Sequence, residues 1–210
     1  MLLTEAKPNT LKIHVYILHN QNPIALKTSI PLSHNKDSIQ INTLKFYIST
    51  IDFYNKGKII YSDNKYVHLV NFEDSSSTEL NITYPNKLTY DQLKITIGID
   101  SLKNASGNMD GDLSPLKNMY WTWQSGYINL KIEGKFISKE NNLEYHIGGY
   151  REPYACIEQI SPIEINQDEY ELRYNVDSFI NYVESNKSQK IMSPGKSAYD
   201  FFKMFMEGFK

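Results

Sequence analysis

The stretch that decides the fold class is LKIHVYI, residues 11–17. Its apolar residues Leu11, Ile13, Val15 and Ile17 occupy every second position, so in an extended chain they all point to one side. The other side carries a lysine, a histidine and a tyrosine. This period of two is typical of a β-strand that buries one face in a core. It predicts a fold built from such strands.

Short runs of the same kind recur along the whole chain, and aromatic residues make up 13% of it. Aromatic and β-branched side chains are enriched in strands. Turn-forming clusters such as NQNP (20–23) and NKG (55–57) separate the runs. No long amphipathic helices alternate with the runs. The runs therefore predict an all-β fold, an antiparallel β-sandwich. The further strands are expected at Ile39–Ile41, Lys45–Phe53, Lys65–Val70, Thr78–Thr83, Lys94–Ile99, Tyr127–Phe136, Glu144–Ile147, Ala155–Ile160 and Glu169–Val176.

Two segments have the spacing of helices instead. Near the C-terminus, apolar residues follow the three-and-four spacing of one helix face behind the start signal SPG (193–195). We expect a short C-terminal helix there whose apolar stripe packs into the core. Its apolar residues are Ala198, Phe201, Phe202, Phe205 and Phe209. A second short helix is expected at Val176–Tyr182, with Asp177 or Ser178 as its cap.

Length and charge limit the classes of protein that fit. The chain has 210 residues, which predicts a single domain over residues 1–210. Its 22 Lys and Arg against 24 Asp and Glu give a net charge of −2. Proteins that bind nucleic acid usually carry a basic excess, so nucleic acid is not an expected partner. The one cysteine, Cys156, can form neither an internal disulfide nor a CxxC metal site.

No apolar run in the sequence is long enough to span a bilayer. Residues 1–8 also lack the basic start and following apolar stretch that mark an export leader. As it stands, the sequence predicts a soluble chain with neither a transmembrane segment nor a leader.

The densest group of unusual residues lies in the segment 98–126, which holds both tryptophans of the chain. At alternating spacing Trp121 and Trp123 share one face of a strand. They are either a core anchor of the sandwich or the wall of a binding site. In the second case, the tryptophans together with Tyr120 and Tyr127 could stack on a sugar or peptide, which makes a carbohydrate- or peptide-binding module the alternative function.

The loop NMDGD (108–112) offers oxygen ligands at every second position. Asp110 and Asp112 could contribute to a calcium site, because calcium prefers oxygen ligands. The order of residues differs from an EF-hand loop, and an Asx-turn that caps its own backbone is the simpler interpretation.

Five histidines are present, and none stands in a close pair such as HxxxH. Any metal site must therefore be assembled by the fold. His146 is the most informative, because it lies just before the glycine pair Gly148 and Gly149, where the backbone could approach a ligand closely. With no GxSxG elbow and no phosphate-binding loop, we expect a protein that is not an enzyme. An enzyme would have to use carboxylates such as Asp100 or Glu133.

The chain carries the motifs GIDS (98–101), MYWTWQSGY (119–127), EG (133–134) and HIGG (146–149), and the runs LKFYIS (44–49), HLV (68–70) and IMSPG (191–195). In these it resembles the MbnP family, copper-associated proteins of the bacterial cell envelope. The resemblance covers nearly the whole chain, and its tryptophan motif is specific.

The resemblance implies a β-sandwich exported to the periplasm or to the outer membrane and cell surface, after removal of a signal segment or as a lipoprotein. It implies a copper-binding protein and, as its partner, a di-haem protein of the MbnH type that oxidises a tryptophan to kynurenine. Kynurenine offers an aniline nitrogen, and imidazole nitrogens suit copper in either oxidation state. Carried over to this chain, the copper-site residues are Trp121, Trp123, His146, His68 and His19, and either tryptophan is a candidate for oxidation.

Three positions depart from the family pattern. Just ahead of MSPG, where many members have a histidine, this chain has Gln189 and Lys190. Asn118 stands where the family has a glycine before MYW, and asparagine tolerates the left-handed backbone conformation. The first-strand position of a family histidine reads Ile17 here, with His14 and His19 nearby.

Overall fold

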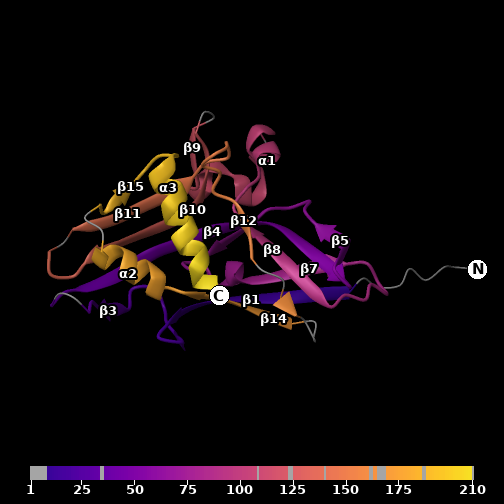
Figure 1. Ribbon diagram of the computed structural model, residues 1–210, viewed down its shortest axis with the longest axis horizontal. Helices are drawn as coiled ribbons and strands as arrows, with labels where there is room; N and C mark the ends of the chain where they lie inside the picture. Colours follow the sequence, from indigo (N-terminus) through magenta and orange to yellow (C-terminus); the bar gives the residue numbers. More distant parts are fainter. Residues whose placement is uncertain are drawn as a thin grey trace, which may run out of the picture.

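The structure is a computed structural model that describes residues 9–33, 36–107, 109–122, 125–139, 141–160, 163–164, 169–185 and 188–209. Its strands form two sheets, which confirms the predicted β-sandwich class (Figure 1). None of the helices in these residues is long and apolar enough to cross a membrane.

The smaller sheet is built around β1 (Asn9–His19), the strand that contains the opening stretch. Its predicted inner residues are buried, with exposures of 0 to 4%. β2 (Asn22–Pro23) and β7 (Glu79–Tyr84) pair with β1 in antiparallel register, whereas β14 (Glu169–Asn175) pairs with it in parallel. The expected antiparallel pattern is thus broken at β1 and β14, which are far apart in the sequence and need no hairpin turn to pair.

The larger sheet follows the order β12 (Glu158–Gln159), β8 (Gln92–Ile97), β4 (Ser38–Asn55), β10 (Gly126–Phe136), β11 (Asn142–Gly148) and β15 (Lys190–Ile191). β11 and β15 are parallel, and the other neighbours are antiparallel. Shorter strands add to it: β3 (Ser29–Pro31), β5 (Lys58–Asp63) and β6 (His68–Asn71) on β4, β13 (Ile163–Glu164) on β8, and β9 (Tyr120–Thr122) on β10.

Several predicted strand boundaries differ from the structure, for example Lys65–Val70, where β6 begins only at His68, and two segments differ most. The runs Ile39–Ile41 and Lys45–Phe53 belong to the single 18-residue strand β4. In Ala155–Ile160 only the two residues of β12 are in a strand. Cys156 in that segment is fully buried, and burial raises the pKa of its thiol to about 12, so it is not a thiolate at neutral pH.

The main core lies between the two sheets and the C-terminal helices α2 (Asp177–Ser185) and α3 (Lys196–Met206), followed by the 3-10 turn η4 (Glu207–Phe209). The predicted C-terminal helix is confirmed, because Phe201, Phe202 and Phe205 are fully buried. Phe201 stacks on Tyr145 of β11 with ring centroids 4.6 Å apart. The expected cap of α2 was wrong: Asp177 is its first residue, and the side chain of Asn175 accepts a hydrogen bond from the Asp177 N–H.

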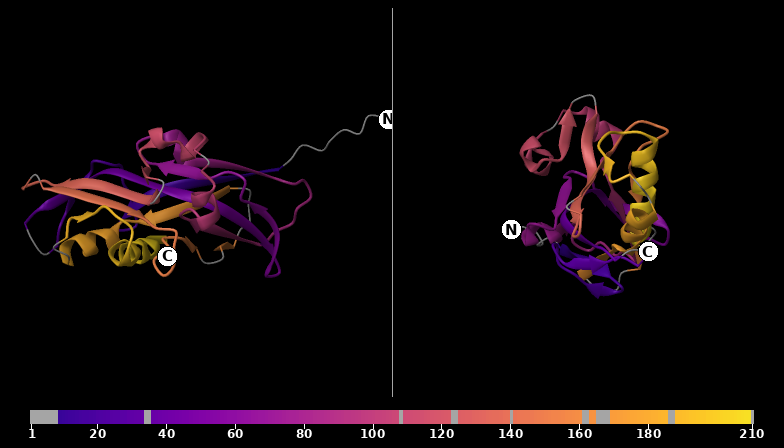
Figure 2. Two further views of the ribbon diagram at one scale, coloured as in Figure 1. Left: turned by 90° about the horizontal axis from the view of Figure 1, so that it is seen from above. Right: turned by 90° about the vertical axis from the view of Figure 1, so that its left-hand side faces the viewer.

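The segment between β8 and β10 forms a projection on the other face of the larger sheet. It contains α1 (Ser101–Ala105), η2 (Gly111–Leu113), η3 (Pro115–Lys117) and β9. Figure 2 shows this projection and the C-terminal helices on opposite sides of β10 and β11. We call the face under the projection the outer face. A separate apolar cluster, which we call the outer cluster, holds the projection against this face. Its buried members are Tyr47, Leu69, Ile99, Leu113, Met119, Tyr127 and Ile128.

Candidate functional site

Trp121 lies on β9 and packs, partly buried, against the outer cluster. Its indole ring covers Gly148 of β11: a Cβ atom added at Gly148 would lie 2.9 Å from Cζ3 of the ring. The same Cβ would also collide with the Tyr127 carbonyl oxygen. The glycine pair was expected to let a ligand approach, and at Gly148 the groups that approach are the protein's own indole and carbonyl.

The indole nitrogen of Trp121 is a buried polar group without a partner. Nε1 finds no hydrogen-bond acceptor in the part of the chain that the structure describes. A buried donor without an acceptor is energetically unfavourable, and such groups are rare in folded proteins. Trp123, the other tryptophan of the motif, lies outside the described residues.

His146 lies on the same outer face as the Trp121 ring. It precedes Gly148 by two residues in β11, and residues two apart in a strand point to the same side, roughly 7 Å from each other. The intervening Ile147 points into the main core. The fold therefore places His146 on the same strand and face as the glycine that the indole covers, which the sequence motif alone could not show.

An ion pair orients His146. Its Nε2 lies 2.7 Å from Oε1 of Glu133 on β10, and Lys131 Nζ lies 3.1 Å from the same oxygen. The side chains of His146 and Lys131 are each 12% exposed and that of Glu133 is 35% exposed. Burial disfavours ionisation of Glu133, but the hydrogen bonds from His146 and Lys131 outweigh it and lower the pKa of the carboxyl group below its ordinary value.

Lys131 also connects this pair to the tryptophan strand. Its Nζ donates to the carbonyl oxygen of Asn118 at 3.4 Å, and Asn118 precedes Trp121 by three residues. Asn118 has a φ of 57°, which confirms that asparagine here takes the left-handed conformation expected of a glycine position. Sequence reasoning did not find Lys131. The sequence signal that could have identified Lys131 is its alternation with Glu133 on one face of the strand. The register between β10 and β11 is needed to show that His146 lies opposite Lys131.

His68 and His19, the other two predicted ligands, lie elsewhere. His68 pairs with Ile48, whose side chain is in the main core, so it points away from the outer face; its Nε2 is 3.9 Å from Asp63. His19 lies at the end of β1 in the smaller sheet, and its Nδ1 is 2.7 Å from Asp177. The structure thus places His146 on the strand and face that the Trp121 ring covers, two residues from Gly148, and does not bring His68 or His19 there. Among the described residues, no three or more His, Cys, Asp or Glu side chains gather in a way that could hold a metal ion.

Of the residues on this face, His146 offers one nitrogen that fits a copper site. A metal-binding histidine commonly donates its other ring N–H to a carboxylate, as His146 does to Glu133. The indole nitrogen of Trp121 has no hydrogen-bond acceptor among the described residues. Imidazole nitrogens are suitable ligands for copper.

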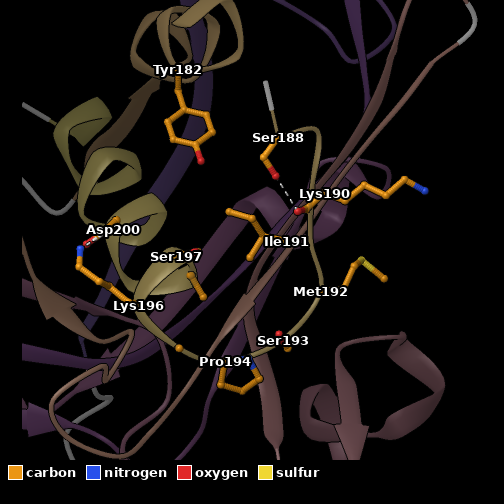
Figure 3. A pocket seen from close by; sticks show the side chains of 12 residues that line it. Tyr182, Ser188, Lys190, Ile191, Met192, Ser193, Pro194, Lys196, Ser197 and Asp200 are labelled. Carbon is orange, nitrogen blue, oxygen red and sulfur yellow. Dashed lines mark hydrogen bonds and ion pairs between the residues drawn. The ribbon is translucent and has the colours of Figure 1, made fainter. Parts of the chain in front are cut away.

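Segments that are distant in the sequence meet around the glycine pair. Pro194, in the IMSPG stretch between β15 and α3, lies 3.6 Å from a Cβ atom added at Gly149. A hollow of about 290 Å³ is lined by Ser125, Gly149 and Pro194, among others. On its other side the IMSPG stretch borders a hollow of about 650 Å³, in which Lys196 of α3 pairs with Asp200 (Figure 3). The tryptophan, HIGG and IMSPG motifs therefore form one continuous region.

The tyrosines proposed for stacking on a ligand are packed inside the protein. Tyr127 is 3% exposed, and its hydroxyl donates to the Leu113 carbonyl oxygen at 3.1 Å. Tyr120 is partly buried, with its ring centroid 5.0 Å from that of Tyr127. The ring face of Tyr127 is therefore not available to a sugar or peptide. Among the described residues, the burial of Tyr127 argues against the carbohydrate- or peptide-binding alternative.

The loop with Asp110 and Asp112 anchors the projection. Asp112 Oδ2 accepts from the Leu69 N–H of β6 at 2.9 Å, and the Asp112 carbonyl accepts from the Tyr47 hydroxyl at 3.0 Å. The Asx-turn interpretation was therefore wrong for Asp112, because its carboxylate binds the backbone of another strand. Asp110 precedes η2 without capping it through its side chain, and Asn108 lies outside the described residues. The calcium prediction stays untested.

Comparison with known proteins points in one direction. The sequence profile of the MbnP family matches residues 7–193. Among solved structures, the fold is similar to that of MbnP from Methylosinus trichosporium, with a TM-score of 0.63 at 14% sequence identity, over 84% of this chain and 78% of that chain. At this level of identity the similarity establishes a shared fold. A search of curated proteins gave no match.

Proposed function

The chain belongs to the MbnP family, and from that premise we propose that it is a copper-binding protein of the bacterial cell envelope, without catalytic activity of its own. It would work in the periplasm or at the outer membrane. The observation that carries the proposal is the placement of the Trp121 ring on Gly148, two residues from His146 on the same face.

Trp121 would be converted to kynurenine before it serves as a ligand. An indole N–H is a donor only and a poor metal ligand, whereas the aniline nitrogen of kynurenine carries a lone pair. The burial of Nε1 without an acceptor among the described residues supports this role, because the nitrogen is not engaged in the fold.

The oxidation requires an oxidant and a partner, for which we name peroxide and a di-haem protein of the MbnH type. Cleavage of the indole C2–C3 bond adds two oxygen atoms and gives N-formylkynurenine, while two molecules of peroxide are reduced to water. Hydrolysis then releases formate and leaves kynurenine. Relative to tryptophan, the product has gained one oxygen and lost one carbon.

Among the described residues of this chain, His146 and the modified Trp121 would be the copper ligands. Copper bound there would be a redox-active ion that the protein can store or transfer to another protein. The protein's part is to hold the two ligands side by side: Gly148 lets the ring approach β11, and Glu133 and Lys131 fix the imidazole.

The test is a copper titration of the full chain, produced with and without its di-haem partner. We expect tight binding only after co-production, and its loss in His146→Ala and in Trp121→Phe. His14→Ala is the matched control, because His14 lies on β1 of the other sheet, and it should bind as the unchanged protein does. Equal copper affinity in His146→Ala and the unchanged protein would refute the proposal. Trp123→Phe identifies the oxidised residue: retained binding in this variant assigns the role to Trp121.

A further inference from the structure

We propose that Glu133 is a positioning residue that fixes His146 as the Nε2–H tautomer and leaves Nδ1 as the nitrogen that binds the metal. This inference rests on the proposed copper function. It assigns a task to two residues, Glu133 and Lys131, that contact no metal themselves.

The hydrogen-bond chemistry determines the tautomer. Nε2 of His146 and Oε1 of Glu133 are 2.7 Å apart. An ionised carboxylate only accepts hydrogen bonds, so the shared proton must come from Nε2. A neutral imidazole has one N–H, and with that proton on Nε2, Nδ1 carries the lone pair.

Glu133 is held as a carboxylate by a cation. Lys131 Nζ lies 3.1 Å from the same Oε1, and its side chain is as shielded from solvent as that of His146. The other charged groups nearby on this face are paired among themselves. Lys45 binds Glu73, and Glu144 binds Lys190, each at 2.9 Å. No second cation or carboxylate of these pairs competes for Glu133.

Lys131 links the pair to the tryptophan strand as well. Its hydrogen bond to the Asn118 carbonyl holds the turn that leads into β9. One ammonium group therefore contacts both the carboxylate that orients His146 and the backbone that leads to Trp121.

Among the described residues, one other histidine lies within hydrogen-bond distance of a carboxylate, and it is arranged differently. His19 contacts Asp177 through Nδ1, and its Nε2 is 3.1 Å from the side-chain amide of Asn20, so both ring nitrogens have partners. For His146, the described residues provide no partner for Nδ1. A free nitrogen lone pair opposite a carboxylate-bound N–H is the arrangement seen in histidines that bind metals.

The direct test is the tautomer itself, measured by long-range 1H–15N NMR on the metal-free full chain at a pH where the ring is neutral. We expect a protonated Nε2 and an unprotonated Nδ1 for His146. In Glu133→Gln, the amide can donate or accept, so a mixture of tautomers is expected. Glu144→Gln is the matched control, because Glu144 lies opposite Glu133 in the register and pairs with Lys190. A protonated Nδ1 in the unchanged protein would overturn the inference, whatever the copper result.

Titration of the same proteins with copper alone, after co-production with the partner, tests the consequence. Loss of such an outer partner typically weakens metal binding roughly 10- to 100-fold. We expect that loss in Glu133→Gln and unchanged affinity in Glu144→Gln, with thermal unfolding confirming that both are folded. Equal losses in both variants would show a general effect of charge and overturn the role of Glu133. The expected tautomer in a protein that binds no copper would instead refute the proposed function and leave Nδ1 without a metal to bind.

Discussion

Trp121 and Gly148 are in direct contact across two strands of the larger sheet, with Cζ3 of the indole 2.9 Å from the place of a Cβ atom at position 148. The contact explains why a glycine stands at this point of β11. It also places the tryptophan motif next to the strand that carries His146.

Replacing Gly148 by alanine should therefore disturb the site and the fold together. Its Cβ would overlap both the Trp121 ring and the Tyr127 carbonyl, and overpacking of this kind costs about 1 to 3 kcal/mol. Chemical denaturation followed by tryptophan fluorescence measures the loss. An alanine variant as stable as the unchanged protein, with the same emission spectrum, would show that the ring does not rest on Gly148.

Replacing Phe201 by alanine should strongly destabilise the fold. Phe201 is fully buried and stacks on Tyr145, and truncation of a buried phenylalanine costs about 3 to 5 kcal/mol. Leu116→Ala is the control, since Leu116 is 91% exposed and should change the free energy of unfolding by less than about 0.5 kcal/mol. Similar values for the two variants would contradict the placement of α3 in the core.

Asp112→Ala should loosen the projection that carries Trp121. The change leaves the Leu69 N–H without its acceptor, and an unsatisfied buried donor costs about 1 to 3 kcal/mol. Hydrogen exchange at the Leu69 amide is the measurement, and we expect faster exchange there. Lys117→Ala removes only the charge 3.9 Å from Asp112 and should leave that amide protected. Unchanged exchange in Asp112→Ala would rule out the anchoring role.

Acid should weaken the cap of α1. Desolvation opposes ionisation of Asp100, but hydrogen bonds from the Lys103 N–H and side chain outweigh it, so the folded-state pKa lies below its ordinary value. A carboxyl group with a lowered pKa stabilises the fold above its unfolded-state pKa, and that contribution is lost as the pH falls through the folded-state pKa. Asp100→Asn keeps a capping side chain without the charge. The stability difference between the two proteins should shrink on acidification, and a constant difference would contradict this assignment.

The sequence pattern predicted the elements whose apolar residues recur at a regular spacing within the element. The alternation in LKIHVYI and the phenylalanine stripe of α3 are both confirmed, because each reflects a buried face of one element. The parallel pairing of β1 with β14 could not be foreseen, since it joins residues such as Val15 and Leu172 with no local signal. The short helix α1 was also missed, because it buries no residue.

The candidate site was predictable in its parts and not in its assembly. The tryptophan motif and His146 were identified from the sequence, but their placement on one face depends on the register between β10 and β11 and on the approach of β9. The same holds for Asp112, whose partner Leu69 lies on a strand 43 residues away. His19 and His68 share a residue type with His146, but the fold places them on the smaller sheet and on the other face of the larger sheet.

The most direct test of the central claim is peptide mass spectrometry of the segment around Trp121, on protein isolated from its native host. The account predicts a Trp121 side chain that has gained one oxygen and lost one carbon, in protein that carries copper, and an unmodified side chain when the di-haem partner is absent. An unmodified Trp121 in copper-loaded protein from the native host would contradict it.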